Sequence, residues 1–168
     1  NIANGTDVIL LDDAYQHRYV NPGVNILLVD YHRLIIYDKL LPAGRLREHQ
    51  KGKNRANIVI ITKCPKDLKP MEIRVLIKAM DLFPYQTLFF TTLEYRALHP
   101  IFEGSERKLE EMKDTNILLL TGIASPLQMV LDIKPYCKNI TPLSFSDHHA
   151  FTAKDVETIN NTFASLPF

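Results

Sequence analysis

The sequence predicts an α/β protein, with a doubly wound, mostly parallel sheet and flanking helices, followed by a second, smaller α/β subdomain. Two observations support this class: short apolar runs recur along the chain, and segments with helical periodicity separate them. A polar, charge-dense stretch at 96–115 divides the runs into two groups. We therefore expect a first domain over 1–104, a linker over 105–115 and the start of a second subdomain over 116–168, both units being incomplete.

Six short apolar runs are candidate strands. Each is apolar at successive positions, which is typical of parallel strands covered by helices on both faces. The runs lie at 8–11, 24–30, 56–62, 86–92, 116–122 and 139–145, of which the last is the least regular.

Three segments between or after these runs have helical patterns, at 69–83, 126–136 and 152–166. In the first, Pro70 suits the opening turn of a helix, since its nitrogen needs no hydrogen-bond partner there. The third opens with Thr152 and Asp155, spaced as in a capping box.

Composition excludes several classes of protein. The formal net charge of +1 disfavours a nucleic-acid binder, which would carry a basic excess, so we expect no nucleic-acid partner. No apolar run reaches the 18 residues that a bilayer span requires. The two cysteines, Cys64 and Cys137, lack metal-binding spacing and fit a reducing cytoplasm.

The first motif is a pair of acids, Asp12 and Asp13, directly after the apolar run 8–11. Ligands of open parallel sheets bind at the carboxyl ends of strands. Adjacent carboxylates repel each other, so a cation such as magnesium would stabilise them there, as in the Walker B pattern. The alternative is that these acids only cap a helix or form a turn.

The second motif is a basic loop at 39–57 that includes a Pro-Ala-Gly turn. After that turn come Arg45, Arg47 and four other basic or histidine residues, with Glu48 as the one acid among them. Guanidinium groups beside a metal-binding strand end suit the binding of phosphate oxygens. A solvated charged loop is the alternative.

The third motif places Asp147, His148 and His149 between the run 139–145 and the last helix. Histidine titrates near neutral pH, so this loop could hold a general base or a residue that assists one. A surface or helix-capping role remains open for both histidines.

Four ordered segments together resemble the tetraacyldisaccharide 4'-kinases, the lipid A 4'-kinases of Gram-negative bacteria. They are "DDAYQH" (12–17), "LLPAGRLRE" (40–48), "TGIASP" (121–126) and "SDHHAFT" (146–152). The resemblance implies a P-loop kinase fold and transfer of the ATP γ-phosphoryl group to the 4'-hydroxyl of an acylated diglucosamine phospholipid. It also implies a peripheral enzyme on the cytoplasmic face of the inner membrane, with membrane contact through a part N-terminal to this chain.

The resemblance also implies roles for individual residues. Asp12 and Asp13 would hold Mg²⁺, Arg47 would contact phosphate, and His148 with Asp147 would assist the catalytic base. Gln16 and His17 would line the ATP site beside the two acids. The chain departs from the family pattern at four positions, which are Ala14, Tyr15, Arg45 and Ser146.

The sequence contains no G-x-x-x-x-G-K-[ST] loop, which in P-loop proteins surrounds the β- and γ-phosphates with backbone N–H groups. We therefore expect a kinase fragment that is inactive alone, the loop and the catalytic Asp lying upstream in the resembling family. The alternative is a non-catalytic nucleotide-binding or regulatory α/β module.

Overall fold

The computed structural model describes residues 5–123 and 126–167. The chain divides into two compact units, Asn1–Glu94 and Tyr95–Phe168. The division thus falls N-terminal to the boundary expected at 104. Part of the stretch expected to be a linker, 105–115, is ordered within the second unit, where it forms the 3₁₀ helix Leu109–Met112 with a buried Leu109.

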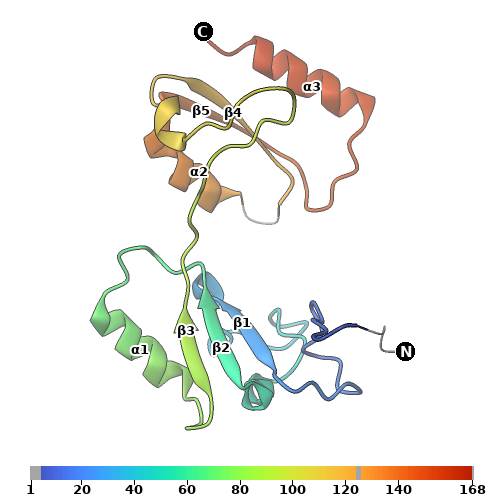
Figure 1. Ribbon diagram of the computed structural model, residues 1–168, viewed down its shortest axis with the longest axis vertical. Helices are drawn as coiled ribbons and strands as arrows, with labels where there is room; N and C mark the ends of the chain where they lie inside the picture. The colour runs from blue at the N-terminus through green and yellow to red at the C-terminus, as the bar shows by residue number, and fades with distance from the viewer. Residues whose placement is uncertain (1–4, 124–125, 168) are drawn as a thin grey trace. The chain divides into compact units, whose positions relative to one another are not determined.

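The first unit contains a three-stranded parallel sheet in the order β1-β2-β3 (Figure 1). The strands are β1 (Ile26–Asp30), β2 (Ile58–Thr62) and β3 (Thr87–Phe90). They confirm three of the predicted apolar runs. Parallel pairing aligns the carboxyl ends of the strands at one edge of the sheet.

The helix α1 (Pro70–Met80) connects β2 to β3 and covers the core of this unit. Its N-terminus has Pro70 in the first turn and a capping box between Lys69 and Glu72. Leu76 and Met80, one helical turn apart, are buried against Val29, Val59 and Ile61 of the sheet. The predicted helix at 69–83 is therefore confirmed, although shorter at both ends.

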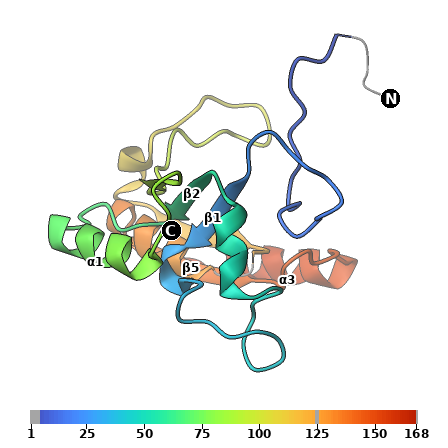
Figure 2. The same ribbon diagram turned by 90° about the horizontal axis from the view of Figure 1, so that it is seen from below.

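The expected strand at 8–11 is wrong. Val8, Ile9, Leu10 and Leu11 form no strand and are between 53% and 89% exposed. Figures 1 and 2 show this part of the chain as an irregular segment outside the sheet. A strand requires a neighbour to bond with its backbone, and apolar composition does not supply one.

The second unit contains the parallel pair β4 (Asn116–Thr121) and β5 (Asn139–Ser144). Helix α2 (Leu127–Ile133) and a 3₁₀ turn (Lys134–Tyr136) connect these strands, and α3 (Ala153–Ala164) follows β5. All these elements match predicted segments, so the α/β class with parallel strands is confirmed for both units. Of the helices within the described ranges, none has both the length and the apolar character needed to cross a bilayer.

Candidate functional site

The segment that carries Asp12 and Asp13 folds as consecutive tight turns. His17 N–H donates to the Ala14 carbonyl at 2.9 Å, and Val20 N–H donates to the His17 carbonyl at 3.3 Å. Asp13 has φ 47°, in the left-handed region that Asp tolerates better than most residues. The turn therefore forms with Ala at position 14, where the family pattern has Gly, and leaves both carboxylates exposed.

The basic loop is closed at its base by backbone bonds. Leu41 N–H donates to Leu46 O at 3.1 Å, and Leu46 N–H donates to Lys39 O at 3.0 Å. Gly44 is required inside this loop, because an added Cβ would collide with the Lys39 carbonyl. The closure fixes the backbone at Leu46, directly before Arg47 and Glu48.

Arg47 and Asp13 form a two-pronged ion pair that joins the first two motifs. The Arg47 guanidinium donates to Asp13 Oδ1 at 2.6 Å and to Oδ2 at 3.2 Å, across 34 residues of sequence. The hydrogen bond from Arg47, aided by its charge, lowers the pKa of Asp13. The same pair raises the pKa of Arg47. Both side chains are largely exposed, at 72% for Asp13 and 56% for Arg47, so solvent and ligands can reach them.

The other predicted residues of this region lie on the same turns. Asp12 and His17 are exposed, while Gln16 is half-buried. The Oε1 atom of Gln16 is buried and has no hydrogen-bond partner among the described residues. Within 5–123 and 126–167, no three His, Cys, Asp or Glu residues come together in a way that could hold a metal ion. The magnesium role of Asp12 and Asp13 stays a prediction.

The two adjacent histidines of the second unit have very different surroundings. The His148 side chain is 95% exposed, and its Nε2 lies 3.9 Å from Asp147 Oδ2. His149 is half-buried, with its ring centroid 4.8 Å from that of Phe145 and 5.2 Å from that of Phe151. Of the two, His148 is the one free to meet a ligand, while His149 is held by packing.

His149 also belongs to the cap of α3. Its Nε2 lies 3.1 Å from Asp155 Oδ2, which accepts hydrogen bonds from Thr152 N–H at 2.8 Å and from the Thr152 hydroxyl at 2.7 Å. These bonds, those from Thr152 first, lower the pKa of Asp155 to about 2. The predicted capping box of Thr152 and Asp155 is confirmed.

Part of the motif "TGIASP" lies outside the described residues, namely Ala124 and Ser125. Before that gap, the Thr121 hydroxyl donates to Ser144 Oγ at 3.0 Å and joins the ends of β4 and β5. The acids, Gln16, His17 and Arg47 thus belong to the first unit, and the Asp147–His148 pair to the second.

Sequence reasoning missed one polar network in the first unit. It centres on Glu48, whose carboxylate binds both Arg18 and Arg55. The signal in the sequence was that Glu48 is the one acid within a basic loop.

Comparison with known families identifies one family over nearly the whole chain. A family model described as tetraacyldisaccharide-1-P 4'-kinase matches residues 2–166. No solved structure matches the chain.

Several curated relatives carry the name tetraacyldisaccharide 4'-kinase. The relative from Phocaeicola vulgatus is 62% identical over 99% of this chain and 46% of its own length. The relative from Bacteroides thetaiotaomicron is 49% identical over 95% of this chain and 44% of its own length. The relative from Flavobacterium johnsoniae is 46% identical over 92% of this chain and 44% of its own length. The chain therefore spans somewhat less than half the length of these relatives, and it belongs to the tetraacyldisaccharide 4'-kinase family.

Proposed function

We propose that this chain is part of an ATP-dependent kinase that phosphorylates the 4'-hydroxyl of a tetraacyldisaccharide 1-phosphate, an acylated diglucosamine phospholipid. Membership of the family supports the proposal, since its relatives are named for this reaction. The observation that carries it is the Asp13–Arg47 ion pair, because it brings the acidic motif and the basic loop into one site.

The chemistry of the two side chains fits a phosphoryl-transfer site. Asp12 and Asp13 offer carboxylate oxygens, the ligand type that Mg²⁺ prefers. Magnesium, when bound, would neutralise charge on the phosphates of ATP. Arg47 offers a planar set of N–H donors that matches phosphate oxygens and gains most as charge develops on the transferring group.

In the free protein, Asp13 and Arg47 neutralise each other. Asp13 would help to hold Mg²⁺ and Arg47 would contact the phosphate oxygens of ATP. Loosening of the existing ion pair would cost little, because the pair is exposed to water.

His148 would take part in proton transfer from the sugar hydroxyl. Its imidazole is exposed and lies beside the Asp147 carboxylate, so it can orient or polarise a base contributed by the rest of the protein. The lipid substrate would bring the enzyme to the cytoplasmic face of the inner membrane as a peripheral protein, anchored through a part N-terminal to this chain.

The test is kinetic and uses the full-length protein with MgATP and the lipid acceptor. Arg47→Ala should lower kcat more than it raises KM, and Arg47→Lys should restore little, because an ammonium cannot form the two-pronged contact. Arg74→Ala, which removes an exposed arginine of α1, is the matched control and should leave kcat unchanged. A normal kcat in Arg47→Ala would contradict the proposed role, and nucleotide binding without any transfer would favour the regulatory module.

A further inference from the structure

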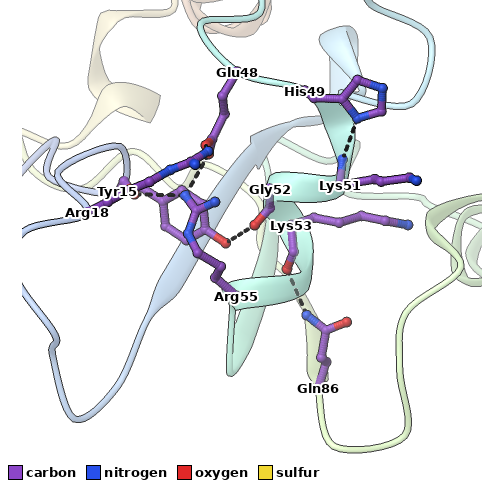
Figure 3. A network of polar contacts seen from close by, with 9 residues as sticks. All are labelled: Tyr15, Arg18, Glu48, His49, Lys51, Gly52, Lys53, Arg55 and Gln86. Carbon is purple, nitrogen blue, oxygen red and sulfur yellow. Dashed lines mark hydrogen bonds and ion pairs between the residues drawn. The ribbon is translucent and has the colours of Figure 1, made fainter.

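The acidic turn and the basic loop are joined at a second place, which we name the Glu48 clamp and define as Glu48, Arg18, Arg55, Tyr15 and Gly52 (Figure 3). Glu48 Oε1 accepts a hydrogen bond from Arg55 Nη2 at 2.7 Å. Glu48 Oε2 accepts one from Arg18 Nη2 at 2.9 Å. Each oxygen of one carboxylate thus holds a different arginine.

Glu48 and Arg55, at the centre of the clamp, are better protected from water than the Asp13–Arg47 pair, whereas Arg18 is exposed. The Glu48 side chain is only 17% exposed and that of Arg55 is 34% exposed. Burial opposes the charge on Glu48, but the hydrogen bonds from Arg55 and Arg18 outweigh it and lower the pKa of Glu48. The carboxylate therefore stays charged and paired at neutral pH.

Tyr15 ties the acidic turn to the clamp from the other side. The Arg55 guanidinium lies 4.8 Å from the centre of the Tyr15 ring and donates to the Tyr15 carbonyl at 3.0 Å. The Tyr15 hydroxyl donates to the Gly52 carbonyl at 2.8 Å. The family pattern has Phe at this position, so the hydroxyl of this chain adds a bond that Phe could not make.

The 3₁₀ helix that carries Arg55 is attached to the sheet. Arg55 ends the 3₁₀ helix Gln50–Arg55, and the Gln86 amide donates to the Lys53 carbonyl at 2.9 Å (Figure 3). The same amide donates to the Ala56 carbonyl at 2.8 Å. These bonds attach the helix to the start of β3. Arg55 is therefore a fixed point against which Glu48 can be held.

Gly52 leaves the space that the Glu48 carboxylate occupies. A Cβ built on Gly52 would lie 2.6 Å from Glu48 Oε1 and 2.7 Å from its Cδ. Any larger residue at position 52 must push this carboxylate away, although its charge would remain.

The clamp and the Asp13–Arg47 pair differ in how firmly they can join the acidic turn to the basic loop. An exposed ion pair contributes little to fixing two loops, because water and salt compete for both charges. The clamp has three hydrogen bonds and a cation–π contact between the same two segments. A fourth hydrogen bond, from Arg55 to Glu48, lies within the basic loop. Glu48 directly follows Arg47, and Tyr15 lies two residues after Asp13, so the clamp sets the distance across which Arg47 and Asp13 face each other.

We infer that Glu48 is a positioning residue, which holds Arg47 opposite Asp13 through its two arginine partners without touching the reacting groups. The inference rests on the proposed function, because Arg47 must act in phosphoryl transfer for its position to matter. A small displacement of such a group reduces turnover strongly while substrate affinity changes little.

The first test compares variants of the full-length protein in one kinase assay. Glu48→Gln keeps the size of the side chain and removes its charge, and should lower kcat roughly tenfold to hundredfold with little change in KM. Arg18→Gln removes one of the two partners at an exposed position, so it should fold normally and cause a smaller loss. Glu157→Gln, at an exposed acid of α3, should leave kcat unchanged.

The second test separates positioning from a general structural effect. In an Arg47→Ala background, Glu48→Gln and Arg18→Gln should cause no further loss of kcat, because they act through a side chain that is already absent. Gly52→Ala should lower kcat like Glu48→Gln in the normal background and have no effect in the Arg47→Ala background. The melting temperature of each variant is measured alongside.

Each outcome is decisive. If Arg47→Ala alone leaves kcat normal, the proposed function of Arg47 fails. If Arg47→Ala lowers kcat but Glu48→Gln lowers it again by the same factor in that background, Glu48 acts independently of Arg47 and only this inference fails. A normal kcat in both Glu48→Gln and Gly52→Ala would also overturn it.

Discussion

The two candidate site regions are stabilised in opposite ways. In the first unit, Asp13 and Arg47 are joined across 34 residues, and Arg55 reaches Tyr15 across 40. In the second unit, the bonds that shape the loop before α3 span only three to six residues, from Ser146 to His149 and from His149 to Asp155. The first region therefore depends on tertiary contacts between distant loops, whereas the second is a local helix cap that carries an exposed histidine.

This difference predicts that the residues needed for catalysis and those needed for stability are distributed differently in the two regions. In the first, function depends on charges that are exposed and mutually paired, so their loss should leave the fold intact. In the second, function and stability reside on adjacent residues, His148 and His149.

The largest effect is expected at Asp13. In full-length protein, Asp13→Ala should lower kcat by roughly 10²- to 10³-fold, the scale for loss of one preorganised electrostatic group. The melting temperature should hardly change, because the carboxylate is 72% exposed. The assays are initial-rate kinetics with MgATP and thermal unfolding, and Asp67→Ala, at an exposed turn, is the control. A melting temperature that falls together with activity would make Asp13 a structural residue.

The second prediction separates the two histidines. His148→Ala should lower kcat by roughly 10²-fold, the usual scale for lost acid–base assistance, with no change in stability. His149→Ala should affect kcat far less and lower the melting temperature instead, because it removes ring packing and a contact to Asp155. Measurement of both variants for kcat and for thermal unfolding tests this assignment. A larger loss of kcat in His149→Ala would reverse it.

The smallest effect is expected from the α3 cap at acidic pH. Hydrogen bonds in the folded state lower the pKa of Asp155 from 3.8 to about 2. A carboxyl group with a lowered folded pKa adds stability above its unfolded pKa, and that contribution disappears as the pH falls through the folded value. The extra stability of the unmodified protein over Asp155→Asn should therefore be complete above 3.8 and shrink as the pH approaches 2.

Helix content followed by circular dichroism during denaturation, from about pH 5 to about pH 2, measures this difference. Asp114→Asn, at an exposed acid outside the cap, is the control. A stability difference for Asp155→Asn that stays constant over the whole range would show that the carboxylate does not stabilise the cap by its charge.

The same contrast explains what could be predicted from the sequence. The capping box of Thr152 and Asp155 was predictable, because its partners lie three residues apart. The strands β1 to β4 were predictable from continuous apolar runs, and β5 from a less regular one, because such runs are typical of parallel strands in α/β proteins. The run 8–11 has the same composition but forms no strand, because strand formation also depends on a pairing partner.

The site was predictable only in part. The motifs indicated that Asp13 and Arg47 share a function, and the structure places them in contact. The Glu48 clamp could not be foreseen, because no local pattern pairs Glu48 with Arg18 at a separation of 30 residues. Which basic side chains pair with Glu48 depends on how the folded backbone brings distant segments together.

Asp13 and His148 both have positive φ angles, of 47° and 54°. Asparagine, aspartate, histidine and glycine enter this conformation at low cost, whereas β-branched residues are strongly disfavoured. In a library that samples every amino acid at these two sites, Asn and Gly should therefore give well-folded but impaired proteins. Val and Ile variants should also misfold and be lost from the library. Comparison of Asn and Gly with Val and Ile therefore separates the requirement for this backbone conformation from the requirement for the native side chain.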